Sequence, residues 1–300
     1  MSTPAEQRVR DFYGFDFPDE FFWYREFLAK LPPGVLAEAC DMRPAYPFDL
    51  ADGKPVKDHP AHPLWEGRYY HDLPEFVTLF HGTTDGLHWG YYFDSPGEMP
   101  PVVCHYWHGD TFQHAVDGDT LFEATRWQVE SSEEGFLEMI EDDPDEEAHY
   151  RAQIDQLAVI RRALGGYWGG DREETGADYE DTYGGAGWRE PVADTWDHLG
   201  IVVAEKQYKN LSADSFRVAK GRAEPQPTQV MGLAAEAMQL LLDGYPGAAL
   251  KLGRDLWVWA KEFPECYDLL DSAYAALRRE PLRRLLAEAR AWRQACDKGK

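Results

Sequence analysis

The chain has 300 residues, with 54 acidic against 30 basic side chains and a formal net charge of −24 at pH 7. A net charge this negative repels nucleic acid and favours cationic partners, which argues against direct nucleic-acid binding. Apolar residues make up 44% of the sequence, enough for one large core or two ordinary ones, and no apolar run is long enough for a transmembrane helix.

The first predicted helix covers residues 18–30. Pro18 suits the first helical position, and the acids Asp19 and Glu20 complement the positive end of the helix dipole. Apolar side chains recur on one face at helical spacing, as Phe21 and Tyr24 do. Residues 41–64 are rich in proline and have no clear period, so we expect a long connection there.

Short β segments separated by turn residues come next. Aromatic and β-branched runs predict strands over residues 67–70, 75–80, 87–93, 101–107 and 111–116. The short turns between them, such as Gly109-Asp110, predict antiparallel neighbours. A helix is expected to begin at Asp119, packed on this sheet together with the helix at 18–30.

The middle of the chain changes composition. From Trp127 to Tyr150 there are ten acids and no Lys or Arg, and we expect residues 130–150 to face solvent and to be partly disordered. An amphipathic helix is predicted over residues 152–164. Glycines and acids then dominate residues 165–188, a composition typical of a linker. The apolar run over residues 199–204 predicts a single buried strand.

Beyond Thr228 the pattern is helical. Successive apolar faces at helical spacing predict several helices, with breaks at Gly244, Pro246 and Pro264. Residues 278–300 hold eight bases against three acids, so the last helix is basic and is expected to dock on the acidic body of the same chain. The predicted domains are an N-terminal α+β domain over 1–165, a linker over 166–195 and a mainly helical domain over 196–300.

Motifs in the first half carry a resemblance. The segment Asp11–Phe22, with its sequence DFYGFDFPDEFF, and the segment Gly86–Glu98, with its sequence GLHWGYYFDSPGE, resemble the histone PARylation factor 1 family, as do Arg68–Phe76 and Asp117–Ala124. These matches cover most of residues 10–130. The resemblance implies an antiparallel sheet with flanking helices, related to the SUKH superfamily, and hence an α+β fold class.

The second half is similar to the family over shorter stretches. Residues 195–203 resemble its strand, and Leu252–Trp257 resembles its Leu-Gly-x-Asp-Leu-aromatic helix. In the family, a glutamate donated to the partner's active site precedes that helix. Here the corresponding residue is Asp243, one methylene shorter, so the resemblance implies that Asp243 is the catalytic residue. The family's Tyr-Arg dipeptide is absent, and Tyr208-Lys209 stands nearest to its place, several residues out of register.

Three functions are compatible with these observations. The resemblance implies an accessory factor, not active alone, that binds an ADP-ribosyltransferase and completes its active site for serine ADP-ribosylation. The NAD cofactor would then be used by the partner, with none bound directly. The alternative is a SUKH-like immunity or scaffold protein whose acidic surface binds a basic toxin, and a third is a stand-alone enzyme that uses NAD and has a deep pocket of convergent polar groups.

Other chemistry has weaker signals. Eight of the ten histidines lie between His59 and His114, but His105 and His108 are three apart on a predicted strand and so point to opposite faces, which argues against a metal site. The glycine runs at 165–170 and 184–187 lack the flanking pattern of a phosphate loop. Isolated cysteines and the lack of an apolar signal core predict a cytoplasmic protein, or a nuclear one in a eukaryote, without a membrane partner.

Overall fold

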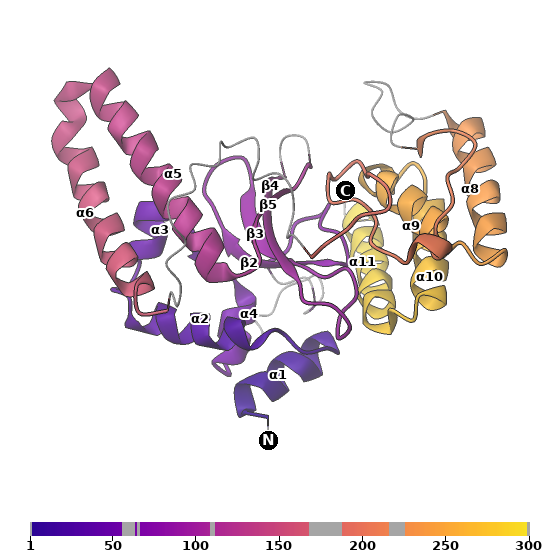
Figure 1. Ribbon diagram of the computed structural model, residues 1–300, viewed down its shortest axis with the longest axis horizontal. Coiled ribbons are helices and arrows are strands. Elements are labelled where there is room, and N and C mark those ends of the chain that lie inside the picture. The colour runs from indigo at the N-terminus through magenta and orange to yellow at the C-terminus, as the bar shows by residue number, and fades with distance from the viewer. Residues whose placement is uncertain are drawn as a thin grey trace.

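The computed structural model describes residues 2–55, 64, 67–108, 112–167, 188–215 and 226–298. A twisted sheet lies at the centre, with the N-terminal helices on one side and the C-terminal helices on the other (Figure 1). The sheet is a five-stranded antiparallel meander whose spatial order follows the chain. Its strands are β1 (Arg43–Pro44), β2 (Phe76–His81), β3 (Leu87–Tyr92), β4 (Val102–Trp107) and β5 (Ala115–Gly118).

Among the described residues, the N-terminal part has six α-helices, and they are α1 (Pro4–Tyr13), α2 (Asp19–Lys30), α3 (Val35–Cys40), α4 (Tyr46–Ala51), α5 (Leu121–Asp142) and α6 (Glu147–Leu164). Helix α1 was not predicted from the sequence. Its signal is a capping box, in which Thr3 accepts from the backbone of Glu6 and the Glu6 side chain accepts from the backbone of Thr3. The strand β1 and the short helix α4 lie within residues 41–64, where a long connection was expected.

Most aromatic residues of the strands lie in the core. Trp89, Tyr91, Tyr92 and Tyr106 are buried, whereas Trp107 is 38% exposed and Tyr69 and Tyr70, before the first long strand, are half-buried. Helix α2 is fixed to α5 by a buried hydrogen bond of 2.5 Å between the Tyr24 hydroxyl and Thr125 Oγ1. The α+β class with flanking helices is therefore confirmed, and so is the antiparallel pairing.

The predicted strand at 67–70 is wrong. Asp72 closes a turn here, because its carboxylate accepts from the Tyr69 amide at 3.0 Å while its own amide donates to the Tyr69 carbonyl at 3.1 Å. The buried Arg68 guanidinium also donates to the Leu73 carbonyl, which holds the segment in turns. The last strand begins later than predicted, at Ala115, and residues 109–111 lie outside the described residues.

The prediction that the acidic stretch at 130–150 is partly disordered is also wrong, although the prediction that it faces solvent is confirmed. Helix α5 runs through to Asp142 and meets α6 after a short 3-10 turn at Pro144–Glu146. Three acids of this stretch pair with arginines, at distances of 2.8 Å for Glu130 with Arg126, 2.5 Å for Glu133 with Arg161 and 3.4 Å for Glu147 with Arg151. Burial of Leu157 and Ile160 adds the apolar contacts that keep the hairpin folded.

The C-terminal part is mainly helical, as predicted. Its helices are α8 (Pro227–Leu242), α9 (Pro246–Asp255), α10 (Glu265–Ala276) and α11 (Glu280–Lys298), with 3-10 turns at Glu205–Gln207 and Trp257–Trp259. The strand predicted over 199–204 is wrong, since the region makes a single bridge between Ala193 and Ile201. Arginine side chains take its carbonyls instead: Arg254 donates to Gly200 at 2.6 Å, and Arg189 donates to Leu199.

One hydrophobic cluster extends from α1 to α11, so the helical part packs directly on the sheet part. The Trp257 indole donates to the His71 carbonyl at 2.9 Å, and the Tyr274 hydroxyl donates to Glu75 at 2.6 Å. Basic α11 docks intramolecularly, as expected, with Arg293 donating to the Tyr70 carbonyl at 2.8 Å. The domain boundaries stay a prediction because residues 168–187 lie outside the described part.

No helix within the described residues is both long and apolar enough to cross a membrane.

Candidate functional site

Asp243 lies at the end of α8, on the surface. It is the C-terminal cap of that helix, and its amide donates to the Gln239 carbonyl at 3.0 Å. The Gln239 side-chain amide donates to Asp243 Oδ1, also at 3.0 Å, which orients the carboxylate. Gly244 follows with φ of +95°, a left-handed conformation that reverses the chain after the helix. The carboxylate is therefore exposed but held at one end by its own helix.

The outer face of α8 carries exposed apolar side chains. Met231 is 63% exposed and Leu242 is 75% exposed. With the exposed Ala235 between them, they recur at helical spacing on one stripe, opposite the buried residues Val230 and Ala237. This α8 stripe, defined as Met231, Ala235 and Leu242, runs along the helix to the residue before Asp243.

Helix α9 packs against α8 and supports the end of α8 that carries Asp243. All ten of its residues are buried. Gly253 is required there, because a Cβ at this position would lie 2.7 Å from the Leu270 side chain. The Leu252–Trp257 motif thus packs α9 on α10 and fixes where the chain leaves Asp243.

The polar residues of the same motif tie α9 to the segment before it. Asp255 accepts from the Trp196 amide at 2.8 Å and from the Ser215 hydroxyl at 2.6 Å. Lys251 donates to the same carboxylate at 2.8 Å. Burial raises the pKa of Asp255, and the nearby Lys251 ammonium offsets this rise only in part. These groups are fully engaged with one another, which is the arrangement of structural side chains that position the site.

Lys209 lies near the Asp243 turn. Its ammonium is 5.6 Å from the centroid of the Tyr245 ring, two residues beyond Asp243. The neighbouring Tyr208 hydroxyl donates to Asn210 at 2.9 Å. The structure therefore brings the Tyr208-Lys209 dipeptide to the same end of α8, despite its distance along the chain.

A buried polar network in the sheet was not foreseen from the sequence. Asp72 accepts from Thr78 Oγ1 and lies within hydrogen-bonding distance of His88 Nε2, both at 2.9 Å, and it also accepts from the Tyr106 hydroxyl. Burial alone would raise the pKa of Asp72, but His88 and Arg68 hold it well below its usual range. Asp72 is fully buried, so this network stabilises the meander and has no access to a substrate.

Several of the histidines lie together around the aromatic rings of the sheet, and the ring centroids of His71 and His108 are 5.1 Å apart. His105 Nδ1 lies 2.7 Å from Asp117, His108 stacks on Tyr69 with ring centroids 4.9 Å apart, and His114 is buried with its pKa lowered to about 4 by burial. In the described part of the chain no group of His, Cys, Asp or Glu is arranged to hold a metal ion. His59 and His62 lie outside the described residues, as do residues 168–170 of the first glycine run and the whole second run at 184–187.

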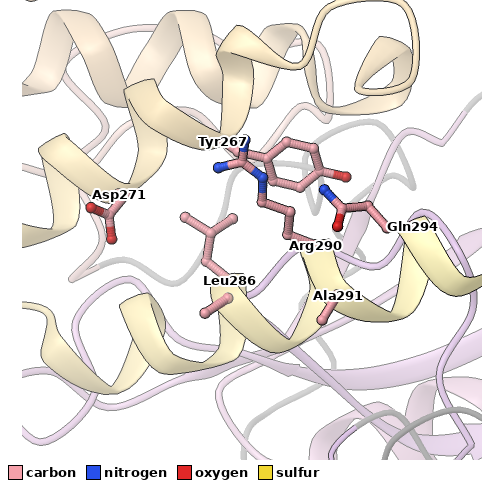
Figure 2. A pocket seen from close by; sticks show the side chains of 7 residues that line it. Tyr267, Asp271, Leu286, Arg290, Ala291 and Gln294 are labelled. Atoms are coloured by element: carbon pink, nitrogen blue, oxygen red, sulfur yellow. The ribbon is translucent and has the colours of Figure 1, made fainter.

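A cavity of about 390 Å³ lies between α10 and α11. Figure 2 shows Arg290 reaching from α11 toward the ring of Tyr267, whose centroid is 5.1 Å away. Arg290 also pairs with Asp268 at 3.0 Å, and Asp271 at the other end pairs with Arg283 at 2.9 Å. The charged groups that line this cavity are therefore paired within the fold and do not converge on a common point.

Comparison with known proteins adds an independent finding. The family model described as histone PARylation factor 1 matches residues 4–164, more than half of the chain. Histone PARylation factor 1 from Mus musculus is 31% identical over 113 residues, which cover 34% of this chain and 32% of the mouse protein. The protein of that name from Danio rerio is 28% identical over 110 residues, covering 34% of this chain and 31% of its own. The matches lend no support to the alternative of an immunity or scaffold protein.

The chain spans about a third of the length of the curated relatives it matches, at 32% for the mouse and 31% for the zebrafish protein. The match of the family model covers α1 to α6 and the whole sheet, the part that the sequence motifs singled out. This chain belongs to the histone PARylation factor 1 family.

Proposed function

We propose that this chain is an accessory factor that binds an ADP-ribosyltransferase and completes its active site for serine ADP-ribosylation. The transferase would bind NAD, and this chain would supply the carboxylate of Asp243. Family membership supports the accessory role. The observation that supports Asp243 as the site residue is the α8 stripe, an exposed apolar surface that ends next to an exposed carboxylate.

The chemistry needs one proton acceptor. The serine oxygen bonds to the anomeric carbon of the NAD ribose as the bond from that carbon to nicotinamide breaks, and the hydroxyl proton goes to the carboxylate. One oxygen of Asp243 is held by Gln239, at 3.0 Å. A carboxylate fixed in this way at the edge of an apolar contact surface would be brought to the transferase by docking, and the contact would exclude water around it.

Docking can be tested apart from catalysis. Met231 lies on the α8 stripe, twelve residues and about three helical turns before Asp243. Met231→Glu places a charge in the proposed interface without touching the carboxylate, and we expect it to weaken binding to a cognate poly(ADP-ribose) polymerase about tenfold or more. Leu137→Glu is the matched control, because Leu137 is 42% exposed on α5, away from α8.

Binding is measured by surface plasmon resonance with the immobilised transferase, and thermal melting verifies that both variants fold. Weaker binding of Met231→Glu alone would support docking through α8. Equal binding of Met231→Glu and wild type, with Leu137→Glu also unchanged, would remove α8 from the interface.

A further inference from the structure

A second exposed surface lies on the opposite, N-terminal part of the molecule. A groove of about 620 Å³ runs between α3, the edge strand β1 and the α5–α6 hairpin. Helix α3 packs against both helices of that hairpin, which projects from the sheet in Figure 1. The groove involves neither α8 nor Asp243, so it is independent of the function proposed above.

Apolar side chains form one wall of the groove. Phe136 and Tyr150, from the two helices of the hairpin, stack with ring centroids 6.1 Å apart. Met139 lines the groove one turn further along and is 52% exposed. Gly135 lines it as well, and no atom lies within 4 Å of where its Cβ would be. The wall thus has an exposed thioether and an unfilled floor, which is room for apolar side chains of a partner.

Acids surround this wall. Glu38 and Asp41 line the groove, and Arg43 is the one basic residue among its described lining residues. Asp142 ends the same helix three positions after Met139, so it lies about one turn beyond it, and Asp143 follows as the C-terminal cap. The Asp41 carboxylate accepts from the Thr83 amide at 2.8 Å, which fixes its charge at the edge of the groove.

Most of this charge is uncompensated. Of the ten acids between Trp127 and Tyr150, three pair with arginines, and the other seven, all within residues 134–146, form no ion pair with any described residue. The acids continue along α5 past Met139, so a ligand that fills the groove and neutralises them must be elongated. A second copy of this chain is a poor occupant, because the chain carries a charge of −24 and the basic helix α11 is docked internally.

We propose that this groove binds a cationic peptide segment of another protein that carries large apolar side chains among lysines or arginines. The apolar side chains would contact Phe136 and Met139, while the basic ones would lie against Asp142, Asp143 and the acids that follow. Both parts are needed: the charges attract and orient the segment, and the groove holds it.

The probes are three fluorescein-labelled synthetic peptides of equal length. The first consists of lysines and leucines, with the leucines at helical spacing so that they share one face. The second has the same lysines but serine in place of each leucine. The third has the same leucines but glutamate in place of each lysine. Fluorescence anisotropy measures binding to the full chain. We expect only the lysine–leucine peptide to bind tightly, and its affinity to fall steeply between about 0.05 and 0.5 M salt, because exposed charges are screened beyond about 10 Å at 0.1 M.

Gly135→Arg tests the groove itself. The side chain would fill the open floor and add a positive charge, and we expect it to weaken the lysine–leucine peptide about tenfold or more. Gly232→Arg on α8 is the matched control, since Gly232 is also a helical glycine with open space at its Cβ. The ¹³C-methyl NMR signal of Met139 should shift on titration of the peptide, while that of Met231 should stay in place.

Each outcome decides the proposal. A shift confined to Met139, with loss of binding in Gly135→Arg but not in Gly232→Arg, supports the groove. Equal binding of the lysine–serine peptide would show that the acids attract any polycation without the groove. Tight binding of the glutamate–leucine peptide, an unmoved Met139 signal, or wild-type affinity of Gly135→Arg would overturn the proposal.

Discussion

Arg254 and Asp197 form a buried, two-point ion pair that connects α9 to the segment preceding it. Arg254 Nη2 lies 2.6 Å and its Nε lies 3.0 Å from the Asp197 carboxylate, and the guanidinium also lies 5.1 Å from the centroid of the Tyr92 ring in β3. Burial alone would raise the pKa of Asp197, but Arg254 holds it at about 2. One arginine thereby fixes the helix after Asp243 to the sheet.

Asp197→Ala should destabilise the protein by about 3–5 kcal/mol, because it leaves the Arg254 charge buried and unpaired. Asp271→Ala, which breaks the exposed pair with Arg283, should cost less than about 1 kcal/mol. Urea unfolding at pH 7 measures both. Equal losses for the two variants would show that the Arg254 pair contributes no more than a surface pair does.

Glu20 should make stability depend on pH. It accepts from the Leu121 amide at 2.5 Å and from the Tyr91 hydroxyl, and burial raises its pKa to about 7. The folded state therefore holds the proton more tightly than the unfolded chain, whose glutamates have a pKa of about 4.3. The contribution of this group to stability is complete below about pH 4 and is lost as the pH rises toward 7.

Wild-type stability should fall relative to Glu20→Gln between about pH 5 and 7, by at most about 1.4 kcal/mol per pH unit. Urea unfolding of both proteins across this range provides the measurement, and the difference between them isolates Glu20 from other titrating groups. Parallel stability curves for the two proteins would contradict a raised pKa.

Gly90 should tolerate no side chain. It pairs with Thr78 on one side and Cys104 on the other, and a Cβ there would lie 2.3 Å from the Val77 carbonyl oxygen. We expect Gly90→Ala to cost about 1–3 kcal/mol or more. Gly135→Ala, in an open helical position, should instead stabilise by about 0.5–1 kcal/mol. Thermal or urea unfolding would contradict this explanation if both substitutions shifted stability in the same direction.

The sequence predicted what local patterns determine. Helical periodicity located the C-terminal helices, and alternation with turn residues located three strands of the meander. The capping box at Thr3 and Glu6 could have located α1 as well, because it is a short-range signal. The strand expected at 199–204 failed for a long-range reason, namely that Arg254 takes the Gly200 carbonyl from 54 residues away.

The candidate site is less predictable from local patterns. Only the family resemblance pointed to Asp243, and its exposure depends on how α8 packs. The α8 stripe was hidden in a sequence that is apolar on both faces, where Val230 and Met231 look alike until one is buried and the other exposed. The groove beside α5 arises from packing among α3, α5 and α6, which no single segment specifies.

The most direct test of the central claim is the rate of serine modification with Asp243 altered. ADP-ribose incorporation into a serine peptide is measured with a cognate poly(ADP-ribose) polymerase and NAD, using wild type, Asp243→Ala, Asp243→Asn and Asp243→Glu, with equal partner binding verified for each. We expect Ala and Asn to lower the rate about 10²–10⁴-fold, and Glu, the residue usual in the family, to retain or raise it. Wild-type rates for Asp243→Ala and Asp243→Asn would contradict a catalytic carboxylate at this position.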